Sequence, residues 1–76
     1  MYVVVTKKDT DIVDLIWLGE TFDMTDGLLV IQNEDSLTTF EDFTTVTHNA
    51  YLFDGELTDD LDPSSHKFID GQFVSI

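Results

Sequence analysis

Carboxylates are the side chains that this sequence offers most abundantly for chemistry. The 76-residue chain has 16 aspartate and glutamate residues, three lysines and no arginine, which gives a formal net charge of −13. Grouped carboxylates can bind a cation or present negative charge to a basic partner. The densest run of acids consists of Asp54, Glu56, Asp59, Asp60 and Asp62.

A calcium loop of the EF-hand type is absent. Such a loop needs a carboxylate at its first position and a glycine at its sixth. Placing the glycine of any of the three Asp-Gly pairs at the sixth position puts Phe22, Ala50 or His66 at the first. The acids at 59–62 could still bind a cation weakly, but the pattern favours a solvated loop.

Residues for metal binding by imidazole or for nucleophilic catalysis are sparse. His48 and His66 have no metal-ligand spacing, and the chain has no cysteine. Ser64 or Ser65 could be combined with His48 and an aspartate on paper, but catalytic triads are recognised by geometry rather than by composition. No nucleophile elbow, phosphate loop or dinucleotide fingerprint is present. We therefore expect a non-enzymatic protein without a metal or a cofactor.

The net charge points to the class of partner. A compact domain of this length should be roughly 30 Å across, and duplex DNA carries about 18 phosphates over that distance. The protein and the duplex are therefore comparable in negative charge per length and should repel each other, so we expect no direct binding to nucleic acid. We instead predict binding to a basic protein surface, such as that of a nucleic-acid-binding enzyme. In the alternative interpretation the acids only solubilise the domain and mark loops, because 12 of the 16 are the turn-forming aspartate.

Short β-strands must position these side chains. Residues 2–6 are β-branched and predict a strand, and residues 12–19 are apolar on both alternating faces, which predicts a central strand. Asp14 interrupts one of those faces, and a buried carboxylate needs a partner. We expect that partner to be Lys7 or Lys8 across a hairpin. We expect Trp17 to pack in the core, the alternative being that it is exposed as an anchor for a binding partner.

Three Asp-Gly pairs predict two-residue hairpin turns. A type I′ turn at residues 26–27 would pair Met24 with Leu29 and Phe22 with Ile31. The pair at residues 54–55 would set Leu52 opposite Leu57. The pair at residues 70–71 would set Phe68 opposite Phe73, an aromatic pair that closes the C-terminal hairpin.

A single small domain, residues 1–76, follows from these elements. We predict a mainly β fold of about 5–6 strands in antiparallel hairpins. Ser36 is a possible helix cap, and apolar residues recur at helical spacing after it, so one short helix is predicted near residues 36–43. The lysines follow the N-terminal apolar run, which is therefore neither a secretory signal nor a membrane span, and no membrane partner is expected.

The closing stretch, residues 57–76, resembles the end of small acidic proteins that phages of Gram-positive bacteria encode, often in or near the tail module. The matching residues are Asp62, Pro63, Phe68, Asp70, Gly71, Phe73 and Val74. Size and acidity also resemble, by composition alone, phage inhibitors that mimic DNA, such as the uracil-DNA glycosylase inhibitor and several anti-CRISPR proteins. Both resemblances imply a phage or prophage protein.

Charge and resemblance together predict an acidic inhibitor that acts in the host cytoplasm. It would block the basic nucleic-acid-binding surface of a host or defence enzyme, with the acids between residues 54 and 62 as its contact. The alternative is a minor virion or tail-assembly protein whose apolar edge docks to a larger phage structural protein.

Overall fold

Eight β-strands and no helix occur in residues 1–59 and 61–76, the part of the chain that the computed structural model describes. The strands are β1 (Tyr2–Lys7), β2 (Val13–Leu18), β3 (Thr21–Met24), β4 (Leu29–Asn33), β5 (Ser36–Phe40), β6 (His48–Phe53), β7 (His66–Ile69) and β8 (Gln72–Ser75). All strand pairings are antiparallel. The prediction of a small, mainly β domain is confirmed, with more strands than expected.

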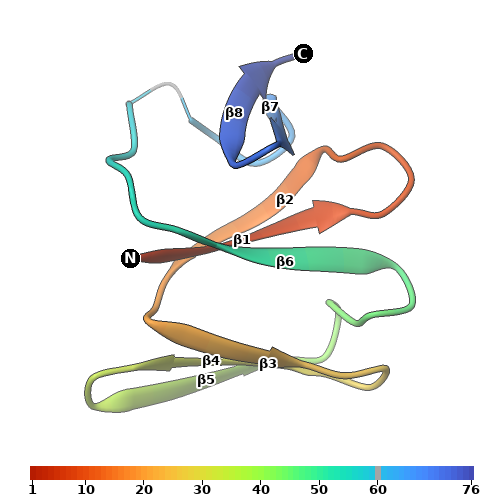
Figure 1. Ribbon diagram of the computed structural model, residues 1–76. Coiled ribbons are helices and arrows are strands. Elements are labelled where there is room, and N and C mark those ends of the chain that lie inside the picture. The colour runs from red at the N-terminus through yellow and green to blue at the C-terminus, as the bar shows by residue number, and fades with distance from the viewer. Residues whose placement is uncertain (60) are drawn as a thin grey trace.

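The strands form three layers (Figure 1). A sheet with the order β2-β1-β6 lies in the middle, the sheet β3-β4-β5 covers one face, and the β7-β8 hairpin covers the other. Both faces of the middle sheet are therefore buried at its centre, which suits a strand made almost entirely of β-branched residues.

That central strand is β1, and the prediction that residues 12–19 would be central is wrong. Val3, Val4 and Val5 are completely buried in β1, whereas β2 lies at an edge of the sheet. Odd and even positions of β1 serve different cores, because neighbouring side chains in a strand point to opposite faces. Val3 and Val5 pack with the β3-β4-β5 layer, and Val4 packs with the C-terminal hairpin.

Two of the three predicted hairpin registers are confirmed. In the first hairpin Met24 pairs with Leu29 and Phe22 with Ile31. In the last, Phe68 pairs with Phe73, and their ring centroids are 4.9 Å apart.

The turn chemistry differs between these two hairpins. Asp70 and Gly71 have positive φ angles of 54° and 78°, as a type I′ turn requires. Asp26 and Gly27 do not, so the type I′ prediction is wrong there. The Thr25 hydroxyl oxygen instead accepts hydrogen bonds from the N–H groups of Gly27 and Leu28, each at 3.2 Å. These bonds help to close the turn without positive φ angles.

The pair Asp54-Gly55 forms no hairpin, and the predicted pairing of Leu52 with Leu57 is wrong. β6 ends at Phe53, and the described residues between it and β7, 54–59 and 61–65, form no further strand. The Phe53 ring packs edge-on against Phe68 and Phe73 and lies over Gly55. Burial of this ring fixes the course of the chain more strongly than the turn preference of Asp-Gly does.

The helix predicted near residues 36–43 is also absent. Ser36–Phe40 forms β5 and pairs along its whole length with β4. Thr38 and Thr39 are β-branched and favour a strand. Partly buried Phe40 packs against the core beneath the middle sheet. Packing of the strand face therefore outweighs the weak helical spacing.

Trp17 lies at the surface more than expected, since 40% of it is exposed. Its ring packs against that of Phe40 in a T-shaped arrangement at a centroid distance of 5.1 Å, which ties β2 to the β3-β4-β5 sheet. No helix of the described chain is long and apolar enough to cross a membrane.

Candidate protein-binding surface

The predicted contact residues lie on the segment that connects β6 to the C-terminal hairpin. Asp54, Glu56, Asp59 and Asp62 are all exposed, whereas Asp60 lies outside the described residues. In Figure 1 this segment runs along one side of the molecule, from the middle sheet to the upper hairpin. The four described acids therefore face solvent and are accessible to a partner.

The end of this acidic segment is held by Ser64 and Ser65. The Ser65 hydroxyl donates to the carbonyl oxygen of Asp62 at 2.6 Å, and the Ser64 N–H donates to the carbonyl oxygen of Val13 at 2.7 Å. Ser64 has a positive φ of 73° at this point. These bonds tie the segment to β2 and hold the backbone at Asp62.

A second acidic surface was missed from the sequence. The chain between residues 20 and 42, which builds the β3-β4-β5 layer, contains seven exposed acids and no lysine, arginine or histidine. They are Glu20, Asp23, Asp26, Glu34, Asp35, Glu41 and Asp42. The lack of any basic residue could have been read from the sequence. Their common layer could not, because they belong to different strands and turns.

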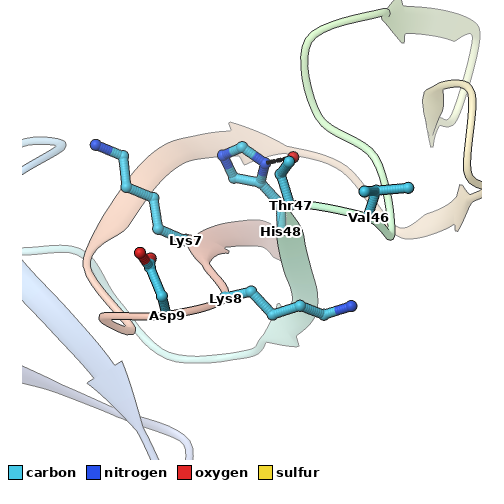
Figure 2. Close-up of a pocket in the computed structure, with 6 residues that line it drawn as sticks. All are labelled: Lys7, Lys8, Asp9, Val46, Thr47 and His48. Atoms are coloured by element: carbon cyan, nitrogen blue, oxygen red, sulfur yellow. Dashed lines mark hydrogen bonds between the residues drawn. The ribbon is translucent and has the colours of Figure 1, made fainter.

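Positive charge is gathered at one end of the middle sheet. Lys7 is the last residue of β1 and Lys8 follows it. With Asp9, Val46, Thr47 and His48 they line a hollow of about 400 Å³. Figure 2 shows that the two lysine side chains point in different directions. The Lys8 ammonium donates to the carbonyl oxygen of Thr45. The hollow therefore has no converging pair of ammonium groups.

His48 is the partner of Asp14, and the prediction of Lys7 or Lys8 is wrong. His48 Nε2 lies 2.8 Å from Asp14 Oδ2, and both side chains are mostly buried. Residue 14 is the extra residue of a β-bulge, because Val5 pairs with Leu15 while Thr6 pairs with Val13. The bulge aims the carboxylate across the sheet toward β6.

The other imidazole nitrogen also has a partner. His48 Nδ1 lies 2.7 Å from Thr47 Oγ1 (Figure 2). An order of carboxylate, imidazole and hydroxyl can activate a nucleophile. The N–H groups of Thr47 and His48, however, already donate to the carbonyl oxygen of Thr44 at 3.2 and 2.9 Å, so they are not free to stabilise an oxyanion. We interpret the network as a structural tie between β2 and β6.

The described residues form no evident metal site. Among residues 1–59 and 61–76, no three side chains of histidine, cysteine, aspartate or glutamate lie close enough together to hold an ion. The exposed carboxylates are instead spread over loops and one sheet, which is an arrangement suited to contact with a large charged surface.

Comparison with known proteins gives no family assignment. No protein-family model matches the chain, and no curated protein or solved structure matches it either. The resemblance of residues 57–76 to phage proteins therefore remains a prediction from the sequence.

Proposed function

We propose that the protein is a phage or prophage inhibitor that binds the basic nucleic-acid-binding surface of a host or defence enzyme and blocks it by mimicking DNA. The observation that carries the proposal is the density of exposed carboxylates. The molecule measures 30 × 27 × 18 Å and has a net charge of −13, whereas duplex DNA has about 18 phosphates over about 30 Å. The two are comparable in charge per length.

The separation of charge along the sheet supports an oriented encounter. The register of β1 and β6 places Phe53 beside Tyr2 and His48 beside Lys7. The acidic segment after Phe53 therefore begins at the end of the sheet opposite to Lys7 and Lys8. A basic surface is attracted more strongly to the acidic end than to the other end, where Lys7 and Lys8 offset nearby acids such as Asp9, and this difference favours one docking orientation.

The energy of this contact comes from many small terms. A single exposed ion pair contributes about 0.2–1 kcal/mol, and salt screens it. Many such acids acting together raise the association rate and give binding that weakens steeply as the salt concentration rises. Blocking needs no chemical step, because an occupied basic surface cannot bind nucleic acid.

The test uses two triple variants with the same change in charge. One replaces Asp59, Asp60 and Asp62 with lysine, and the control replaces Asp26, Glu34 and Asp35 with lysine. Each tagged chain is incubated with extract of the host, washed with rising salt, and the bound proteins are identified by mass spectrometry. Duplex DNA is then added as a competitor.

We expect the unaltered chain to retain a nucleic-acid-binding enzyme that salt and duplex DNA release. The 59–62 variant should lose that enzyme, and the control should keep most of it. Equal losses in both variants would show that residues 59–62 are not the specific contact. Recovery of phage structural proteins alone, retained at high salt, would contradict the inhibitor.

The second candidate, a minor virion or tail-assembly protein, is supported by the exposed apolar side chains. Leu18, Val46, Leu52 and Ile76 are among the large apolar residues at the surface. An interface built on such residues gains its energy from buried apolar area and responds little to salt. The salt wash therefore separates the two functions.

A further inference from the structure

The outer edge of β6 is an open side of the middle sheet. β6 is the last strand in the order β2-β1-β6. The N–H of Lys8 donates to the carbonyl oxygen of Thr47 at 3.0 Å, so the alternation of antiparallel hydrogen bonding turns the backbone of Ala50 and Leu52 away from β1. These two residues present N–H and C=O groups outward, in the pattern that an additional strand requires.

β6 lacks the devices that usually protect an edge. Its sequence, His-Asn-Ala-Tyr-Leu-Phe, has no proline, lysine or acid, and its register with β1 runs without a bulge. The opposite edge, β2 with the residue before it, is partly covered by Ser64 and by β7. Ser64 donates to Val13, and Ile12 forms a bridge with Lys67.

A hollow of about 330 Å³ lies beside β6 on the side of the C-terminal hairpin. It is lined by Asp11, Tyr51, Phe68, Ile69, Asp70 and Gly71. The Tyr51 ring packs 5.4 Å from that of Phe68 and remains 38% exposed. Two carboxylates beside an exposed aromatic ring match a lysine or arginine side chain, through charge and through contact with the ring face.

A second hollow, of about 390 Å³, lies on the other face of β6. Phe22 and Met24 contribute apolar walls beside Ala50, and Asp23 and Lys8 contribute opposite charges. The Lys8 ammonium is already bonded to the Thr45 carbonyl oxygen. Thr45, His48 and Asn49 complete its lining. The hollow therefore has no excess of formal charge, and its Phe22 and Met24 walls can contact an apolar side chain.

We propose that an extended segment of the partner adds to β6 as a fourth strand of the middle sheet. Because side chains of a strand alternate between faces, the segment would place a basic side chain beside Tyr51 and an apolar one beside Ala50. Main-chain bonds then hold the segment, and the two hollows select its sequence. The partner's basic character rests on the proposed function, and the acidic segment that starts at Asp54 continues from the same edge.

The test uses the full chain and a synthetic peptide with blocked ends, threonine-lysine-valine-lysine-valine-lysine-threonine. The control peptide, threonine-lysine-lysine-lysine-valine-valine-threonine, has the same composition and charge without the alternation. NMR titration gives the affinities, and amide hydrogen exchange reports protection. We expect the alternating peptide to protect the Ala50 and Leu52 amides and to bind at least about tenfold more tightly than the control peptide.

Two leucine variants locate the site. Leu52→Pro removes an outward N–H of β6, and Leu37→Pro makes the same change at the edge of β5, where alternation also turns the N–H outward. Leu52→Pro should weaken binding of the alternating peptide about tenfold or more, and Leu37→Pro should leave it nearly unchanged. If Leu52→Pro does not fold, Tyr51→Ala and exchange protection in the unaltered chain decide the question.

Each contrary result overturns strand addition. Equal binding of both peptides would show that charge attraction by itself explains the affinity. That result would exclude the β6 site without contradicting the proposed inhibitor. Absence of peptide binding, or equal effects of the two proline variants, would also exclude β6. If the Ala50 and Leu52 amides become more protected from exchange as the protein concentration rises in the absence of peptide, the β6 edge pairs with a second copy of the chain. If the unaltered chain retains no nucleic-acid-binding enzyme in the extract experiment, the proposed function itself is overturned.

Discussion

Asp14 shows how a single residue connects strands that are distant in the sequence. Its bulge position turns the carboxylate toward His48, which is 34 residues away. The Phe43 ring packs against the imidazole in a T-shaped arrangement at a centroid distance of 5.1 Å. The apolar pattern around Asp14 indicated that a partner was needed. It could not indicate which one, because a bulge of one residue changes the side to which every later side chain points.

Replacing Asp14 with alanine should therefore destabilise the fold. The change removes an acceptor from a mostly buried imidazole, and loss of such a hydrogen bond costs about 1–3 kcal/mol. Urea unfolding followed by circular dichroism measures the free energy of unfolding. Asp9→Ala, at an exposed neighbouring position, serves as the control and should change it by less than about 0.5 kcal/mol. Equal effects of the two substitutions would contradict a role for the Asp14–His48 pair.

At the scale of elements, local turn signals predicted register better than they predicted conformation. The hairpins around Gly27 and Gly71 pair as the Asp-Gly spacing indicates, although only the second uses positive φ angles. The signal failed at Gly55, where the contacts of Phe53 with two distant phenylalanines decide the path. Such contacts span many residues and leave no mark in the local sequence.

The same limit applies to β5 and to the candidate site. Apolar residues from Leu37 to Phe43 recur at helical spacing, but the segment pairs with β4 through its backbone N–H and C=O groups. A pattern of side chains does not show which backbone groups will pair. The exposed acids of residues 54–62 could be predicted because they are contiguous. The open edge of β6 could not, since it depends on which strand ends the sheet.

A matched pair of glycine substitutions tests the account of Gly55. A Cβ atom at Gly55 would lie 2.6 Å from Cζ of Phe53, whereas at Gly27 its nearest neighbour is Thr25 Oγ1 at 3.9 Å. Gly55→Ala should lower the free energy of unfolding by about 1–3 kcal/mol, because the partly buried Phe53 ring must move. Gly27→Ala should be neutral or stabilise by up to about 1 kcal/mol. Thermal and urea unfolding compare them, and a neutral Gly55→Ala would refute the close packing of this ring.

For the whole molecule, the acidity that supports binding acts against folding. Among the described residues, the one close contact between a carboxylate and a basic side chain is that of Asp14 with His48, so most carboxylates are balanced by no nearby cation. Seven of them share the β3-β4-β5 layer. Like charges on a small molecule repel one another in the compact state. A bound basic surface would relieve that repulsion, and salt should do so in part.

Stability should consequently rise with ionic strength. At 0.01 M salt the screening length is about 30 Å, and at 0.15 M it is about 8 Å. The molecule measures 30 × 27 × 18 Å, so its acids interact across the whole structure at the lower concentration and only locally at the higher one. We expect the melting temperature to increase over this range of sodium chloride. A variant with Glu34→Gln, Asp35→Asn and Asp42→Asn, which keeps the fold's apolar contacts, should show a smaller increase. A melting temperature that falls with salt would mean that attractive charge pairs outweigh repulsion between the carboxylates. The acids would then be balanced within the fold, and a basic partner would relieve no repulsion by binding them.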